Sequence, residues 1–149
     1  MKFAQNHILL LMLLAGLHLF GCSEPIPDET RIRQRIAEMS TATGAKELAA
    51  VMEPIHEDFL GNERIRKANL KGLVLIHFQR HRKVHVFVND VDVVLKGEEA
   101  EVTCNVILAG RNELLPEQGR VLRVTSQWKK IDDDWFVVSA SWRDPLMPN

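Results

Sequence analysis

The sequence predicts an α+β domain, with N-terminal helices packed on a curved antiparallel sheet of about four strands. Apolar residues recur at three- and four-residue steps between residues 29 and 80, which is the period of a helix. From Val84 onward they alternate with polar residues, the period of a strand with one buried face. The alternation changes phase near Asn89 and Asp90, which predicts a β-bulge and a bent strand.

Length, charge and cysteine count narrow the class of protein. A chain of 149 residues suits one domain. Its 19 Lys and Arg nearly balance its 20 Asp and Glu, so no overall charge attracts nucleic acid, and we expect no nucleic-acid partner. Two cysteines cannot build a disulfide scaffold. No phosphate-binding glycine motif, G-x-S-x-G or C-x-x-C is present. We therefore expect no cofactor.

The N-terminus has the layout of a secretory signal. Lys2 precedes an apolar run from Ile8 to Phe20. As a helix this run reaches only about 20 Å, short of the roughly 30 Å hydrocarbon core of a bilayer. We therefore expect a signal peptide over residues 1–21, with a membrane-spanning anchor as an alternative.

The residues around Cys22 identify the type of signal. Leu19 to Cys22, LFGC, resembles the lipobox of bacterial lipoproteins. The resemblance implies that Cys22 is diacylated and begins the mature chain, and Ser23 after it implies sorting to the outer membrane. Acyl chains contribute about 0.8 kcal/mol per buried methylene, enough to anchor a domain without a spanning helix. We expect residues 22–29 to be a lipidated tether that holds the protein at the bacterial cell envelope, facing the periplasm. An ordinary signal with a chance cysteine is the alternative.

Three helices are expected before the sheet. The first begins at Glu29 and is interrupted at residues 40–44, and the second follows from Ala45 until Pro54 ends or bends it. Asn62 is expected to cap the third. The expected inner side chains are Ile32, Ile36, Met39, Leu48, Val51, Met52, Ile55, Ile65, Leu70, Leu73, Val74 and His77.

Four strands are expected after the helices. The bent strand from Val84 is followed by strands over residues 101–110, 120–131 and 135–142. The last of these, WFVVSASW, is apolar on both faces. It is therefore either a central strand or one whose outer face meets a partner.

This layout resembles the nuclear transport factor two-like superfamily, which includes the SnoaL-like and ketosteroid isomerase-like groups. The stretches that carry the resemblance are IHEDFLGN, VHVFVNDVDVVLKGEEAEVTCNVILAG and DDDWFVVSASW. It covers residues 32–143, and we place the domain at residues 30–144 with a tail at 145–149. The resemblance implies a cone-shaped, cystatin-like fold with a pocket between helices and sheet. It also implies a homodimer through the sheet face.

Three acids are candidates for the pocket. Enzymes of the superfamily use aspartate, histidine or tyrosine inside the cone, and this chain has no tyrosine. Asp90 and Asp92 flank the expected bulge, where side chains are often re-aimed toward a site. They could equally be solvated acids on a strand. Asp58 lies beside His56 and could act with it as a base, or could belong to a polar turn that ends a helix.

Further pocket candidates are His81 and Trp128. His81 follows His77 by four residues, a spacing that can chelate a metal, but the neighbouring cations oppose this and we expect no metal. His81 could instead complement the negative end of a helix. Trp128 could line an apolar ligand site or pack in the core. Cys104 alternates with valines and is expected to be a small buried residue.

These observations support an envelope-anchored lipoprotein whose domain is not an enzyme and binds a small apolar ligand or a protein partner. The alternative is a small hydro-lyase or isomerase with Asp90 or Asp58 as its base. A purely structural or assembly role is a third hypothesis. A carboxylate inside a closed pocket would favour the enzyme.

Overall fold

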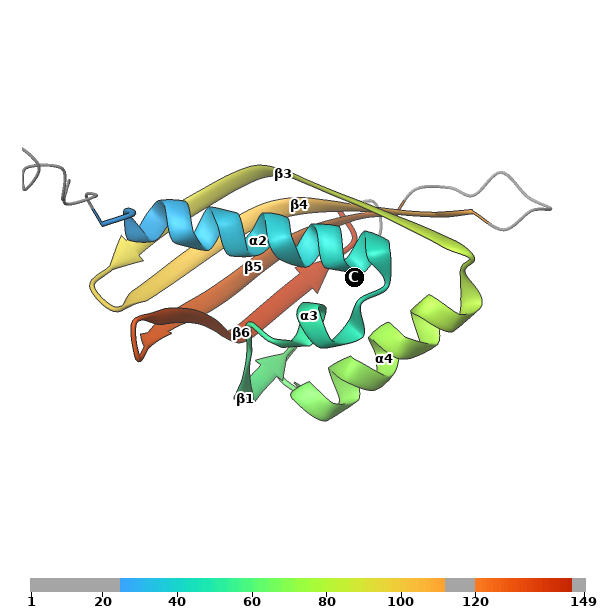
Figure 1. Cartoon of the computed structure of the whole chain (residues 1–149), viewed down its shortest axis with the longest axis horizontal. Coiled ribbons are helices and arrows are strands. Elements are labelled where there is room, and N and C mark those ends of the chain that lie inside the picture. The colour runs from blue at the N-terminus through green and yellow to red at the C-terminus, as the bar shows by residue number, and fades with distance from the viewer. Residues whose placement is uncertain (1–24, 112–119, 146–149) are drawn as a thin grey trace, which may run out of the picture.

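The computed structural model describes residues 25–111 and 120–145 (Figure 1). Cys22 and the expected signal peptide lie outside the described residues. In chain order the elements are α2 (Asp28–Ala45), α3 (Leu48–Met52), β1 (Ile55–Gly61), β2 (Ile65–Arg66), α4 (Lys67–Arg80), β3 (Lys83–Lys96), β4 (Glu99–Arg111), β5 (Arg120–Ile131) and β6 (Asp134–Arg143). The expected α+β architecture, with helices packed on a curved sheet, is confirmed.

The sheet has six strands in the order β2-β1-β6-β5-β4-β3. β1 runs parallel to β6, and the other neighbouring pairs are antiparallel. The expectation of about four antiparallel strands is therefore corrected to six strands in a mixed sheet. α2 lies across the long strands, while α3 and α4 lie near β1 (Figure 1).

The two missed strands replace a helix end and a helix start. As expected, the helix does not continue past Pro54, since α3 ends at Met52. The polar turn expected around Asp58 is instead part of β1, and the Pro54 carbonyl accepts the N–H of Val137 at 2.9 Å. Asn62 does not cap a helix. Its backbone N–H donates to Ala140 O at 2.8 Å and its Oδ1 accepts the N–H of Trp142 at 2.9 Å. β6 thus lies between β1 and β5, which is the central position expected from its apolar residues.

α2 runs through the segment that was expected to interrupt it. Thr41 and Thr43 donate their hydroxyls to carbonyls one turn earlier, at 2.9 and 2.7 Å, which leaves the helical hydrogen bonds in place. The helix ends at Lys46, which has a left-handed backbone (φ 60°). It begins at Asp28, inside the expected tether. The predicted break at residues 40–44 was wrong because both hydroxyls are satisfied within the helix.

The predicted bulge is confirmed in β3. The register with β4 shifts between Asn89 and Asp92, and Asp90 has a left-handed backbone (φ 51°). The carboxylate of Asp90 accepts the side-chain N–H of Asn105 on β4 at 2.7 Å. An extra residue in one strand bends it, so β3 can curve over α2.

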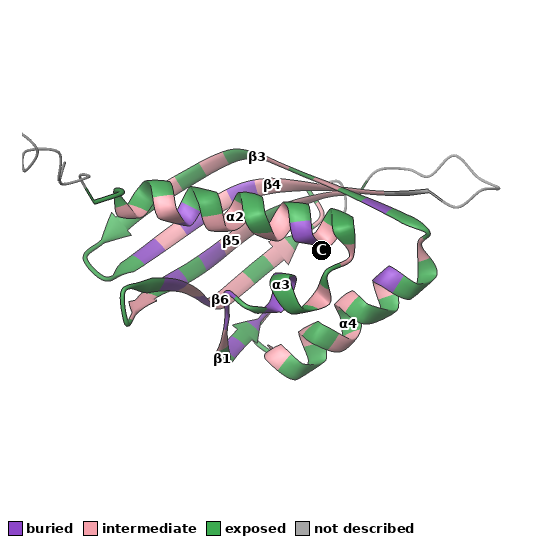
Figure 2. Cartoon of the chain, in the orientation of Figure 1, coloured by how far each residue is buried: buried purple, intermediate pink, exposed green. Residues whose placement is uncertain are grey.

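The core lies between α2 and the sheet, and the buried positions are on these elements and on the segments beside them (Figure 2). The larger cluster comprises Ile32, Met52, Ile55, Phe59, Ala100, Val102, Trp128, Trp135 and Val137. A smaller cluster of Ala42, Val51, Phe78 and Val84 joins α4 to α2 and β3. The described helices, strands and core clusters all lie C-terminal to residue 24. A chain that begins at Ser23 therefore retains the whole described fold.

Gly61 lies at a close contact that no side chain can share. A Cβ at this position would be 2.7 Å from the ring of Trp142 and 3.0 Å from that of Phe59. We expect Gly61→Ala to lower the free energy of unfolding by about 1–3 kcal/mol, the usual cost of overpacking. Gly72 in α4 provides the control, because a Cβ there would meet nothing within 4 Å. Gly72→Ala should stabilise the protein by up to about 1 kcal/mol. Urea unfolding measures both, and equal effects would contradict the packing described.

Candidate functional site

A cavity of about 240 Å³ lies between α2 and the curved sheet. Every described helix and strand except the short β2 and α3 contributes to it. Its lining comprises Ile36, Met39, Ser40, Thr43, Ile55, Phe59, Leu70, Val86, Val88, Val102, Cys104, Val106, Val124, Ser126, Trp128, Val137, Ala140 and Trp142. The inward residues of five neighbouring strands, β1, β6, β5, β4 and β3, converge here because alternate side chains of a strand share one face.

The lining is almost wholly apolar. Its side-chain polar atoms are the hydroxyls of Ser40, Thr43 and Ser126, the thiol of Cys104 and the indole nitrogens of Trp128 and Trp142. Ser40 Oγ donates to Val86 O at 3.1 Å, and Thr43 Oγ1 donates to Met39 O at 2.7 Å. None of the described residues that line the cavity is Asp, Glu, His, Lys or Arg. The lining can therefore hold an apolar molecule but offers it no acid or base.

Trp128 forms one wall of the cavity, and its indole is held in place. Its Nε1 donates to Ser126 Oγ at 3.0 Å, while that hydroxyl donates to Val102 O at 3.4 Å. Trp128 is only 3% exposed. Ser126 was not singled out in the sequence, although a serine between apolar neighbours on the inner face of a strand is the signal that could have found it.

Cys104 places a thiol in the cavity wall. Burial raises the pKa of this thiol above its ordinary value of 9.0, partly offset by the charge of Arg123. The thiol is therefore protonated at neutral pH and a poor nucleophile. Its position makes it a reporter of whether the cavity is occupied.

The three candidate acids lie outside the cavity lining. Asp58 is on β1, and its side chain is 93% exposed. Its carboxylate lies 3.8 Å from His56 Nδ1. Asp90 and Asp92 are exposed at the bulge of β3. The structure thus brings Asp58 to a histidine and Asp90 to Asn105, but places neither beside the cavity.

His81 lies just beyond the end of α4. Its backbone N–H donates to His77 O at 3.2 Å, and the two imidazole rings are 4.4 Å apart between centroids. Its carbonyl accepts a hydrogen bond from Lys46 Nζ, which ties the end of α4 to α2. In the described part of the chain, no three His, Cys, Asp or Glu residues gather in a way that could hold a metal.

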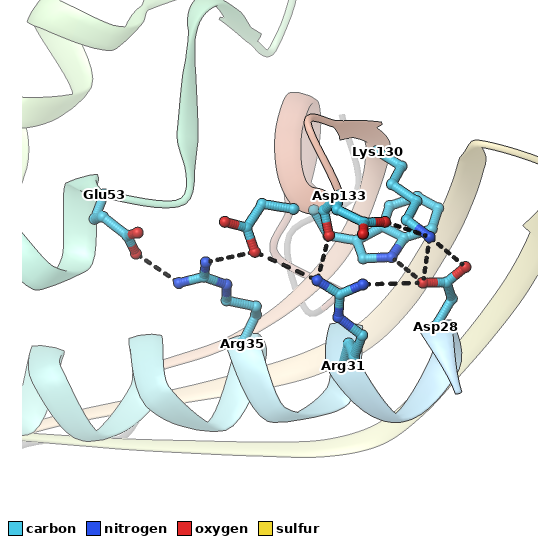
Figure 3. A network of polar contacts seen from close by, with 8 residues as sticks. Asp28, Arg31, Arg35, Glu53, Lys130 and Asp133 are labelled. Carbon is cyan, nitrogen blue, oxygen red and sulfur yellow. Dashed lines mark hydrogen bonds and ion pairs between the residues drawn. The ribbon is translucent and has the colours of Figure 1, made fainter. Parts of the chain in front are cut away.

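An ionic network fastens the start of α2 to the β5–β6 turn (Figure 3). Asp28 accepts the indole N–H of Trp135 at 2.9 Å and pairs with Lys130 at 3.2 Å. Arg35 links Glu53 at 2.7 Å to Asp134 at 3.3 Å. This network positions α2 over the sheet and so holds one wall of the cavity.

The network makes stability depend on pH. The hydrogen bond from Trp135, followed by the hydrogen bond and charge of Lys130, lowers the pKa of Asp28 below 3.8. The ionised carboxylate therefore stabilises the fold above that pH, and this stabilisation is lost as the pH falls through the pKa of Asp28 in the folded protein. The Asp28 hydrogen bond raises the pKa of Lys130 above 10.5, so that contribution is lost as pH rises through its folded value. We expect Asp28→Asn to lower the urea midpoint at neutral pH. We also expect the midpoint of this variant to depend less on pH, both at low pH and at high pH. Asp132→Asn, in the same turn, serves as the control, and a parallel shift by both variants would contradict this assignment.

The outer face of the sheet is mainly polar. Arg123 lies directly opposite Arg143, and the hydroxyls of Thr103, Thr125 and Ser141 occupy the next row of a shallow hollow. At one end an apolar row crosses three strands: Phe87 pairs with Ile107, which pairs with Val121. Phe87 is 60% exposed. The sheet-face homodimer stays a prediction, and this row is where its apolar contact would form.

Comparison with solved structures agrees with the fold. A protein of unknown function with a cystatin-like fold from Nostoc punctiforme matches with a TM-score of 0.66 at 15% identity, over 83% of this chain and 96% of that one. A nuclear transport factor two-like protein of unknown function from Pseudomonas putida matches with a TM-score of 0.66 at 16% identity, over 78% and 86%. The chain therefore has the cystatin-like, nuclear transport factor two-like fold.

Names among the similar structures include enzymes. A protein of this fold from Streptomyces avermitilis that carries a provisional dehydratase name matches with a TM-score of 0.68 at 14% identity, over 80% of this chain and 97% of that one. At such identities the likeness concerns the fold alone. Scans against protein-family models and curated proteins find no match.

Proposed function

We propose that the domain binds a small apolar molecule in the cavity under α2 and is not an enzyme. The observation that carries this proposal is the chemistry of the lining, where aliphatic and aromatic side chains surround the space. Burying an apolar ligand there releases water from apolar surface, which is favourable at about 25 cal/mol per Å². The hydro-lyase alternative needs a base against the substrate. Asp58 and Asp90, its candidate bases, do not line the cavity.

The size of the cavity indicates the size of the ligand. Its volume is about 240 Å³. An apolar cavity of about 150 Å³ is enough for benzene. We infer a ligand the size of one or two fused rings, or a short branched chain. The hydroxyls near the cavity already donate to backbone carbonyls, so the ligand needs few polar groups.

We further propose that Cys22 anchors the protein to the envelope membrane through acyl chains. The support is the lipobox-like LFGC and the apolar run before it. In the described ranges, no helix has the length and apolar character needed to cross a membrane. α2 begins at Asp28, so the tether between Cys22 and the domain is short.

Fluorescence of 1-naphthylamine, a neutral dye of two fused rings, tests the binding proposal on a chain that begins at Ser23. We expect saturable enhancement with one site. Val124→Phe adds a ring inside the cavity and should weaken binding at least tenfold, because it takes up much of the space. Val121→Phe is the matched control, since Val121 on the same strand pairs with Ile107 on the outer face.

The control distinguishes dye binding in the cavity from dye binding elsewhere on the surface. Val121→Phe should bind the dye like the unsubstituted chain. Equal binding by Val124→Phe would contradict the proposal, because the dye would then bind elsewhere. Unfolding midpoints of both variants show whether each is folded.

A further inference from the structure

We propose that the exposed face of α4 and its basic flanks form a surface that binds anionic lipid bilayers. The proposal goes beyond cavity binding and does not depend on acylation of Cys22. It rests on three properties of this segment: charge, exposed apolar side chains and free cationic groups.

Charge is strongly segregated in the chain. Residues 64–89 contain no Asp or Glu, while the rest of the chain holds all 20 acidic residues. The cations of this stretch are Arg64, Arg66, Lys67, Lys71, Arg80, Arg82 and Lys83. A chain of net charge −1 thus carries a stretch of cations without acids on α4 and the segments that flank it. Such a region is attracted to anionic headgroups although the whole chain is not basic.

Apolar side chains lie among these cations. Leu73, Leu75 and Ile76 of α4 are 51, 42 and 46% exposed. At 3.6 residues per turn, Ile76 lies in the middle of the outer face, opposite Val74 and Phe78, which pack against α2 and β3. Figure 2 shows α4 at the margin of the molecule, exposed along most of its length. Leucine and isoleucine at this position can enter the boundary between headgroups and acyl chains.

Lys71 and Arg80 are both exposed on α4. At 3.6 residues per turn, Lys71 borders the apolar face beside Leu75, and Arg80 lies within it between Leu73 and Ile76. Lys67 is paired with Glu57 at 2.6 Å and so is partly neutralised. Within the described residues, 25–111 and 120–145, no ion pair is formed by Lys71, Arg80 or Lys83. Their charges are therefore available to lipid phosphates. A nucleic acid would use the cations but not the leucines, and the mixture of both favours a bilayer.

Vesicle co-sedimentation tests this proposal with a chain that begins at Ser23, so that no acyl chain takes part. We expect binding to vesicles of phosphatidylglycerol and phosphatidylcholine, weak binding to phosphatidylcholine alone, and release by high salt. Lys71→Gln/Arg80→Gln should weaken binding about 25-fold, at about fivefold for each cation. Leu75→Ser/Ile76→Ser should also weaken it, since it removes the inserted side chains.

Leu95→Ser/Lys96→Gln at the far end of β3 is the matched control, because both residues are exposed like their counterparts. It should bind like the unsubstituted chain. Equal binding to neutral and anionic vesicles, no binding, or equal loss in the control would each overturn the proposal. So would a concentration-dependent dimer that the α4 substitutions abolish, because the face would then be a protein interface. Loss of dye binding in the cavity leaves this test unaffected, so the two proposals fail separately.

Discussion

Trp135→Ala is expected to lower the free energy of unfolding by about 3–5 kcal/mol, the usual cost of removing a buried tryptophan. Trp135 is 1% exposed and lies in the larger core cluster with Ile32 and Phe59. The hydrogen bond from its indole N–H is also the main cause of the lowered pKa of Asp28. Alanine would leave a void under α2 and remove the hydrogen bond that ties Asp28, at the start of α2, to β6. Because domains of this size have only about 5–15 kcal/mol of stability, the variant should be close to unfolding.

Urea unfolding followed by circular dichroism measures this effect without relying on tryptophan fluorescence. Trp135→Phe separates its two parts, since it keeps most of the apolar contact and loses only the hydrogen bond, worth about 1–2 kcal/mol. Phe136→Ala, at the next and less buried position, is the control and should cost less. A cost below about 1 kcal/mol for Trp135→Ala would contradict its place in the core.

Cys22→Ala is expected to release the protein from salt-washed membranes of a bacterial host. Without the thiol no acyl chains can be attached. The fraction of the protein that stays on membranes after a high-salt wash should therefore fall from nearly all to nearly none. Intact mass of the unsubstituted protein should correspond to a chain that begins at Cys22 with acyl chains attached.

The salt concentration distinguishes membrane attachment through acyl chains from attachment through the charged α4 surface. Cys22→Ala protein that stays on membranes at low salt and leaves at high salt would fit both proposals, since α4 binds through charge. Cys22→Ser is the isosteric control and should behave like alanine. Salt-resistant retention of either variant would contradict acylation and favour the spanning anchor.

The sequence predicted those parts of the fold that depend on the spacing of apolar residues along the chain. The change from helical spacing to alternation at Val84 located the long strands, and the phase change located the bulge at Asp90. β1 was missed because its partner β6 is far away in the sequence: Leu60 pairs with Ser139, 79 residues later. The local partner β2 has only two residues, Ile65 and Arg66, so little near residue 60 indicates a strand whose main pairing is long-range.

The cavity was predicted less well than the fold. Trp128 was named as a pocket candidate, and the structure places it in the lining. The acids were chosen from the bulge and from a neighbouring histidine, but direction in space decides which residues line a cavity, and adjacent residues of a strand face opposite ways. Segregation of charge onto α4 was visible in the sequence as a run without acids, yet only the fold shows Leu75 and Ile76 exposed within it.

The reactivity of Cys104 tests the central claim most directly. In a chain that begins at Ser23 this residue is the single cysteine, and its thiol lies in the cavity wall. We expect slow alkylation by N-ethylmaleimide, and we expect the alkylation rate to fall at least tenfold further when 1-naphthylamine saturates the protein. The Val121→Phe chain should show the same protection. An unchanged alkylation rate at saturating dye would contradict the claim that the cavity under α2 is the binding site.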